Sequence, residues 1–304
     1  MILSVIIPAY NRAHCLGRAL RSVALQQQVG LEVIIGDDAS TDETVGTALR
    51  FLPDVRIVRL ALNRGAASAR NAAMLNASGE YLAFLDSDDE WLPGKLERQL
   101  QYLREHPECA VCATGHLLAS ADGHRSGFPG RNPVDWRRDL HSAQSFHGAS
   151  TPIIRRSVLE SVGLQDEELR VLEDWDWMLR ISQRHQIHVL PEILAVIHEN
   201  APSDPDHTVR SMEHFLAKHR EEFFRYGAAH ASKVISQHEE NTARTLLRHG
   251  RSVEGAAMLW RSWRHAPLRN PVLLAAFPLA AMDALLGTKL LTEVLVTRSR
   301  RRAR

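Results

Sequence analysis

Three acidic side chains lie close together in the segment Asp86-Ser-Asp-Asp89, directly after an apolar run that ends at Leu85. Carboxylates this close repel one another unless a cation neutralises them. Hard divalent cations such as Mg²⁺ and Mn²⁺ prefer carboxylate oxygens together with the phosphate oxygens of a substrate. The segment therefore predicts a Mg²⁺ or Mn²⁺ site that holds a diphosphate. The alternative is the N-terminal cap of the helix expected from Pro93.

Two further polar motifs follow short apolar segments in the same way. Pro8-Ala-Tyr-Asn-Arg12 follows Leu3–Ile7, and Gly36-Asp-Asp-Ala-Ser40 follows Leu31–Ile35. In an open parallel sheet, ligands bind beyond the carboxyl ends of the strands. We therefore expect the three motifs to meet at one site, although each motif alone is also typical of a turn or a helix cap.

The elements that must position these motifs alternate between strands and helices. Short runs rich in β-branched or aromatic residues predict strands, and apolar residues at helical spacing predict the helices between them. This alternation predicts an α/β fold with a Rossmann-like, mostly parallel sheet flanked by helices. Arginines interrupt the third strand, which we therefore expect near a sheet edge. The expected strands are Leu3–Ile7, Leu31–Ile35, Val55–Leu60 and Tyr81–Leu85, and the expected helices are Leu16–Val23, Asp42–Leu52, Ala66–Leu75, Pro93–Pro107 and Glu173–His185.

The sequence contains no glycine loop of the kind that cradles phosphates. Asn63–Asn71 is not a Walker loop, and no G-x-G-x-x-G follows a strand. These absences exclude a P-loop enzyme and a dinucleotide-dependent dehydrogenase. Gly65 still allows a close approach of the backbone at a helix start, and Arg64 or Arg70 offers positive charge to a nucleotide.

Taken in order, these motifs resemble those of family 2 glycosyltransferases with the GT-A fold. The resemblance covers roughly residues 1–200 and leaves residues 205–304 uncovered. It is carried by Pro8–Arg12, Asp37–Thr44, Asn63–Asn71, Ala77–Trp91, Arg155–Ser157, Val162-Gly163 and Glu173-Asp-Trp-Asp-Trp177. It implies an inverting, metal-dependent transfer of a sugar from a nucleotide-diphosphate donor, most simply a UDP-sugar, to a glycan or glycolipid acceptor in surface polysaccharide synthesis.

The resemblance also implies a role for individual residues. Tyr10 and Asp38 are expected to contact the nucleobase, Arg70 to lie near the nucleotide, and Asp86 to reach the ribose or the metal. Asp88 is the expected metal ligand and Asp174 the catalytic base. The residues expected to bind the nucleotide-sugar are Pro8, Tyr10, Asn11, Arg12, Asp38, Arg70, Asp86 and Ser87.

Inverting transfer has physical requirements that fit this assignment. A carboxylate must take the proton of the acceptor hydroxyl on the face opposite the leaving diphosphate, and the charge of that diphosphate must be neutralised. Glu173 and Asp176 compete with Asp174 for the role of base. The alternative for Asp174 is an acid that only interacts with the helix dipole, since acids are common at helix N-termini. Trp175 and Trp177 are candidates for a sugar-stacking surface, but Trp177 is equally typical of a core residue.

One part of the sequence departs from the family pattern. Many members carry a Tyr-Arg-X-His stretch after this helix, whereas Leu194–Asn200 is shortened and lacks the Tyr-Arg pair. His198 is the candidate to fill the role as a metal ligand, and a solvent-facing loop histidine is the alternative. The spacing of His106, Cys109, Cys112 and His116 looks like a zinc site, but positions 109 and 112 of a strand point to opposite faces, which favours buried cysteines.

Composition sets the remaining expectations. The net charge is +1 and only three cysteines occur, so we expect no bulk attraction to nucleic acid and a reducing, cytoplasmic setting. A linker-like segment near residue 203 predicts a glycosyltransferase domain over 1–203 and a helical extension over 204–304. The extension is largely apolar over Val272–Val296 and ends in a basic run, Arg298–Arg304. Peripheral membrane contact through this tail is one interpretation, a packed helical subdomain or oligomer contact is the second, and a membrane span is the third.

Two other functions remain open at this stage. A nucleotidyltransferase that makes the nucleotide-sugar would also use acids and a metal, but it should carry a glycine-rich basic loop after the first strand. The second is a nucleotide- or carbohydrate-binding protein without catalysis. Asp86, Asp88 and Asp174 argue against the second interpretation.

Overall fold

The computed structural model describes residues 3–26, 30–120, 123, 125–142, 149–199 and 203–267. Its contacts divide the chain into two compact units. The first consists of Met1–Glu167 and Glu173–Glu199, and the second of Glu168–Leu172 and Asn200–Arg304. The assignment of 1–203 to the chemistry and 204–304 to an extension stays a prediction.

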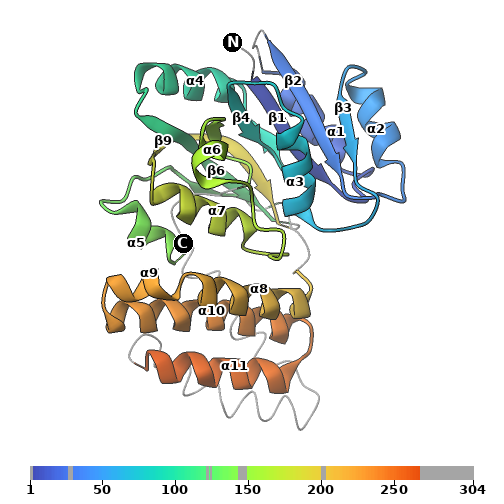
Figure 1. The fold of residues 1–304 in the computed structure, drawn as a ribbon. Helices are drawn as coiled ribbons and strands as arrows, with labels where there is room; N and C mark the ends of the chain where they lie inside the picture. The colour runs from blue at the N-terminus through green and yellow to red at the C-terminus, as the bar shows by residue number, and fades with distance from the viewer. Residues whose placement is uncertain are drawn as a thin grey trace. The chain divides into compact units, whose positions relative to one another are not determined.

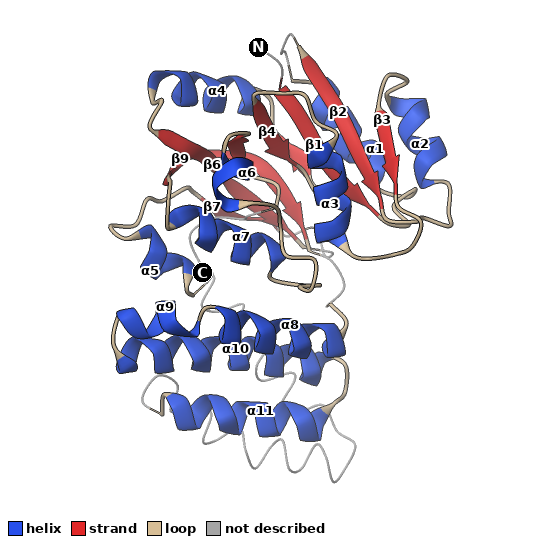
Figure 2. Cartoon of the chain, in the orientation of Figure 1, coloured by secondary structure: helices blue, strands red, loops and turns tan. Residues whose placement is uncertain are grey.

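The first unit is built on one mixed sheet (Figures 1 and 2). Its strands lie in the order β3-β2-β1-β4-β8-β6-β9-β5, and β7 pairs with β6. The first four strands are parallel, as predicted, and β3 forms the edge. The bounds are β1 Leu3–Ala9, β2 Leu31–Asp37, β3 Arg56–Arg59, β4 Tyr81–Phe84, β5 Glu90–Trp91, β6 Cys109–Ala119, β7 Arg125–Phe128, β8 Ile153–Arg155 and β9 Gln186–His198.

Helices cover both faces of this sheet, which confirms the predicted α/β class (Figure 1). Alternate residues of β1 pack with α1, α2 and α4 in one apolar core, while α3 and α7 lie against the other face. Both strands are buried at every position, which explains why β4 is apolar throughout and β1 is apolar except at Ser4. The helices are α1 Leu16–Ala24, α2 Thr44–Phe51, α3 Ala66–Leu75, α4 Lys95–Glu105, α5 Trp136–Leu140, α6 Val158–Val162 and α7 Glu173–Ser182.

Two local expectations need correction. The fourth helix begins at Lys95 after Gly94, whose positive φ of 81° turns the chain into it, and not at Pro93. Cys109 and Cys112 pack into the same core, because a register irregularity between Cys109 and Val111 interrupts the alternation of β6. Both thiols are buried, as expected.

The second unit is helical in its described part. It contains α8 Pro205–Lys218, α9 Arg220–Arg225, α10 Ala228–Arg248 and α11 Ser252–His265. Apolar side chains of α8, α10 and α11 form its core, which includes Met212, Leu246 and Leu259. Among the described residues, the helices are too short or too polar to cross a bilayer. The predicted apolar and basic tail, residues 272–304, lies outside the described residues.

Candidate functional site

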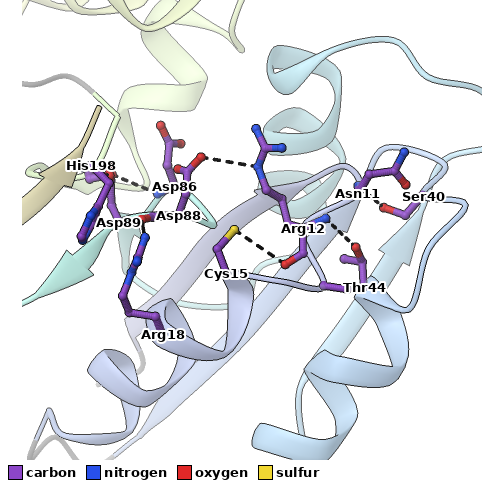
Figure 3. Close-up of polar contacts among 12 residues, drawn as sticks. Asn11, Arg12, Cys15, Arg18, Ser40, Thr44, Asp86, Asp88, Asp89 and His198 are labelled. Atoms are coloured by element: carbon purple, nitrogen blue, oxygen red, sulfur yellow. Dashed lines mark hydrogen bonds and ion pairs between the residues drawn. The ribbon is translucent and has the colours of Figure 1, made fainter. Parts of the chain in front are cut away.

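The loop after β1 is locked to the loop after β2. Asn11 adopts a positive φ of 52°, and its backbone N–H donates to Ser40 Oγ at 3.0 Å (Figure 3). Its side-chain oxygen accepts from the backbone N–H of Thr41 at 2.8 Å. The Arg12 N–H donates to Thr44 Oγ1 at 2.7 Å. The motifs that follow β1 and β2 therefore meet, and the side-chain oxygen of Asn11 helps to hold the two loops together.

Asp38 ties the β2 loop to the start of α3. Its two carboxylate oxygens accept the backbone N–H groups of Arg64 and Gly65, each at 2.7 Å. Helix α3 can come this close because Gly36 has no side chain. A Cβ at this position would lie only 2.1 Å from the Ala69 carbonyl oxygen. Asp38 is buried, while the side chain of Tyr10 is 42% exposed beyond the strand tip. Their contact with a nucleobase stays a prediction.

The acidic segment after β4 forms a compact group of oxygen donors. Asp86, Asp88 and Asp89 each offer a carboxylate oxygen, and these atoms lie within 4.8 Å of one another. Burial and the Asp86 and Asp88 carboxylates raise the pKa of Asp89 well above its usual range, against the hydrogen bonds that it accepts. Ser87 is buried between them. A hard divalent cation fits this set, because it prefers oxygen ligands and removes their repulsion.

Arginines approach the acidic segment from the β1 side. Arg12 Nε lies 3.4 Å from Asp88 Oδ2, and the Arg18 guanidinium donates to the backbone carbonyl of Asp88 (Figure 3). Arg18 Nε also lies 3.6 Å from Glu90 Oε1. The Pro8–Arg12 motif and the acidic segment therefore share one ion pair, where the sequence predicted only that their strand ends converge.

Arg70 joins the acidic segment to helix α7. Its guanidinium lies 2.7 Å from Asp86 Oδ1 and 2.8 Å from Glu173 Oε1, and its side chain is only 4% exposed. Burial alone would lower the pKa of Arg70, but Asp86 and Glu173 raise it further above its usual range. The residue expected near the nucleotide is thus a buried bridge between two acids.

The three candidate bases on α7 occupy different environments. Asp176 is fully buried and pairs with Arg180 Nε at 2.8 Å, so it belongs to the core. Burial raises the pKa of Glu173 to about 7 even though Arg70 pairs with it. Burial also raises the pKa of Asp174; the Arg70 guanidinium opposes that rise and the Asp86 carboxylate adds to it. Asp174 thus lies within electrostatic reach of the acidic segment.

Both tryptophans of α7 are core residues. The indole N–H of Trp175 donates to the Leu140 carbonyl, and that of Trp177 donates to the Gly163 carbonyl at 2.9 Å. Trp177 is fully buried and packs edge-on against Phe84, with ring centroids 5.5 Å apart. A sugar-stacking role is therefore wrong for Trp177, and Trp175 is 8% exposed.

His198 lies beside the acidic segment at the end of β9. Its backbone N–H donates to Asp89 Oδ1 at 2.9 Å, and its ring Nε2 contacts Glu90 Oε1 at 2.8 Å (Figure 3). The group of possible ligands found among the described residues is Asp86, Asp88 and Asp89. Metal binding by His198 stays a prediction.

Sequence reasoning missed Ser150, which contacts the acidic segment at both of its ends. Its hydroxyl donates to Asp89 Oδ2 at 2.5 Å and accepts the Asp86 N–H at 3.0 Å. Ser150 lies just before β8 and belongs to none of the motifs. No sequence motif points to Ser150, because its position beside the acidic segment depends on the antiparallel pairing of β8 with β4.

Comparison with known proteins places this fold and site in a class. Residues 4–162 match the family described as Glycosyl transferase family 2, and the chain belongs to that family. TuaG of Bacillus subtilis (strain 168), a putative teichuronic acid biosynthesis glycosyltransferase, is 42% identical over 125 residues, which cover 40% of this chain and 49% of TuaG. WfgD of Escherichia coli, a UDP-Glc:alpha-D-GlcNAc-diphosphoundecaprenol beta-1,3-glucosyltransferase, is 38% identical over 103 residues, which cover 34% of this chain and 41% of WfgD. The chain thus spans about half the length of these curated relatives.

Solved structures agree with the GT-A fold. The S. aureus TarS 1-349 structure aligns with 98% of this chain and 92% of its own, at a TM-score of 0.59 and 20% identity. The mannosyltransferase PcManGT of Pyrobaculum calidifontis, solved with GDP-Man and Mn²⁺, aligns with 99% of this chain and 85% of its own, at a TM-score of 0.53 and 19% identity. At this level of identity the likeness concerns the fold alone.

Proposed function

We propose that this protein transfers a sugar, with inversion at the anomeric carbon, from a nucleotide-diphosphate donor to an acceptor hydroxyl. One observation carries the proposal. The oxygen donors Asp86, Asp88 and Asp89 lie together, and Arg70 joins Asp86 to the helix on which Asp174 lies. The buried Arg70 guanidinium therefore connects the proposed diphosphate site to the helix that carries the proposed base.

The acidic segment would hold the divalent cation, Mg²⁺ or Mn²⁺, through Asp86 and Asp88. Bound there, the cation supplies neutralisation of the negative charge that grows on the leaving diphosphate. Arg12, whose Nε is 3.4 Å from Asp88, adds positive charge on the same side. A cation bound between these carboxylates also removes the repulsion that accompanies the raised pKa of Asp89.

Asp174 is the proposed base that takes the proton of the acceptor hydroxyl. A partly buried carboxylate with a raised pKa is a stronger proton acceptor than one in water, provided it stays ionised at the working pH. Arg70 favours the ionised form, because its guanidinium stabilises negative charge on α7. Glu173 is taken up by the Arg70 pair and Asp176 by the Arg180 pair, which leaves Asp174 for the chemistry.

Relatives support the choice of donor and acceptor class. TarS has been crystallised with UDP-GlcNAc and PcManGT with GDP-Man, and the name of WfgD describes a diphosphoundecaprenol-linked acceptor. We propose a UDP-sugar donor and a glycan or glycolipid acceptor of surface polysaccharide synthesis. Family membership favours sugar transfer over formation of the nucleotide-sugar or binding without catalysis.

Replacing the base tests this function. The wild type should show a thermal shift with one of the UDP-, GDP-, dTDP- or CMP-sugars in the presence of Mn²⁺, and NMR of the product should show the inverted anomer. We expect Asp174→Asn to keep that shift and to lose transfer by about 10²–10⁴-fold, the usual contribution of a general base. A retained anomeric configuration, or wild-type transfer by Asp174→Asn, would show that the proposed mechanism is wrong.

A further inference from the structure

Ser150 connects the two ends of the acidic segment. It is fully buried, and its hydroxyl donates to Asp89 Oδ2 at 2.5 Å while accepting the Asp86 N–H at 3.0 Å. Its carbonyl accepts the indole N–H of Trp91 at 2.8 Å. One residue thus satisfies polar groups before, within and after the turn that carries Asp88.

Asp89 is held on both of its oxygens. Ser150 donates to Oδ2, and the backbone N–H of His198 at the end of β9 donates to Oδ1 at 2.9 Å. Its own N–H closes the turn onto the Asp86 carbonyl at 3.1 Å. Asp89 is 2% exposed, whereas 26% of the Asp86 side chain and 12% of the Asp88 side chain remain accessible. The three acids therefore differ in what they can offer to a ligand.

We propose that Ser150 is a positioning residue and that Asp89 is a buried anchor, so that Asp86 and Asp88 alone supply ligands to the cation. Ser150, just before β8, and His198, at the end of β9, fix the Asp89 carboxylate from two different strands, and this sets the spacing of Asp86 and Asp88. The inference rests on the proposed function, because it concerns the same cation site. Groups that orient metal ligands in this way commonly change metal affinity by about 10–100-fold when they are removed.

The physical basis is the loss of two hydrogen bonds in one step, one of them buried and the other partly buried. Without the Ser150 hydroxyl, the Asp89 carboxylate loses a donor and the Asp86 N–H loses its acceptor. Leaving buried polar groups unpaired costs more than the bond itself contributes. The turn then relaxes toward water, and the Asp86 and Asp88 oxygens move out of register for a shared cation.

The test is Mn²⁺ binding to the full-length protein without donor, followed by electron paramagnetic resonance of free Mn²⁺. We expect Ser150→Ala to weaken Mn²⁺ affinity about tenfold and Asp89→Asn, which keeps the side-chain shape, to weaken it by a similar factor. The double variant should be no weaker than either single variant, because both changes remove the same anchor. Asp88→Asn should lose binding altogether. Ser150→Thr, which keeps the hydroxyl, should restore affinity to within about threefold of the wild type.

A matched control is Ser182→Ala, which removes another buried serine hydroxyl, one that donates to the Leu179 carbonyl at 2.8 Å within α7. Its Mn²⁺ affinity should equal that of the wild type. The inference is overturned if Asp89→Asn loses binding as Asp88→Asn does, if Ser150→Ala binds Mn²⁺ normally, or if the two changes are additive. Should Ser150→Ala fail to fold, Ser150→Thr and Asp89→Asn decide the matter. Because no sugar donor is used, failure of the proposed transfer reaction would be seen separately.

Discussion

Replacing Arg70 by methionine should destabilise the protein in a manner that depends on pH. The guanidinium is buried between Asp86 at 2.7 Å and Glu173 at 2.8 Å, so its removal leaves two acids unneutralised. Breaking a buried ion pair by removing one partner costs about 3–5 kcal/mol. We expect Arg70→Met to lose about that much of its free energy of unfolding at pH 8.5.

The size of the loss should fall at acid pH because of Glu173. In the wild type its pKa is raised from 4.5 to about 7, so the folded protein binds this proton more tightly than the unfolded chain does. Stability contributed by that proton is full below pH 4.5 and is lost as the pH rises to about 7, a change of about 3 kcal/mol at about 1.4 kcal/mol per unit. Without Arg70 the pKa of Glu173 rises further, and the variant continues to lose stability above pH 7.

Urea unfolding at pH 5.5 and pH 8.5 measures this difference. The gap between the wild type and Arg70→Met should be clearly larger at pH 8.5. Arg98→Met is the matched control, because Arg98 pairs with Glu192 at 2.6 Å in an exposed position, and its removal should leave unfolding nearly unchanged at both pH values. An equal gap at the two pH values, or a gap below about 1 kcal/mol at pH 8.5, would refute the bridging role of Arg70.

Two further predictions concern the framework that holds the site. Gly36→Ala should destabilise the protein by about 1–3 kcal/mol in urea unfolding, because its Cβ would lie 2.1 Å from the Ala69 carbonyl oxygen; an unchanged midpoint would contradict this close approach. Lys95 is fully buried, and burial lowers its pKa from 10.5 to about 7. Between these two pH values the unfolded chain therefore binds more protons than the folded protein. The wild type should gain stability as the pH rises through this range. The free energy of unfolding of Lys95→Met should lack that gain between pH 7 and pH 9.5. An equal pH dependence of unfolding in both proteins would contradict the lowered pKa of Lys95.

The sheet could be predicted from sequence where each strand is buried on both faces. β4 is a continuous apolar run, β1 and β2 are nearly so apart from Ser4 and Glu32, and the polar motifs begin where the runs end. β9 was missed, because Pro191 and register shifts opposite Gly115 break its pattern. A proline inside a run argues against a strand in a sheet, and bulges accommodate such exceptions. The local sequence pattern thus predicted the parallel strands β1 to β4, whereas the remaining strands depend on pairing between distant parts of the chain.

The candidate site was predictable as a set of residues but not as a set of contacts. Acids at strand ends predicted where Asp86 and Asp88 lie, and the family motif supplied Asp174. Burial of Arg70 depends on how closely α3 packs, and the role of Ser150 depends on strand pairing, neither of which is encoded in local spacing. Residues that orient others therefore escape motif analysis more easily than residues that bind.

Arg70 lies between two groups of acids, one around Asp86 and the other around Glu173, and the two groups differ in their environment. Asp86, Asp88 and Asp89 form a group of oxygens that could hold a cation, whereas Glu173 and Asp174 lie where burial favours the protonated form. An arginine bonded to both groups lowers the cost of placing negative charge on each. The proposed metal-binding segment and the proposed proton acceptor can then lie near one another with less mutual repulsion. The two bonds leave from separate nitrogens of one planar guanidinium, Nη1 to Glu173 and Nη2 to Asp86, a fixed spread of donors that the single nitrogen of a lysine does not offer.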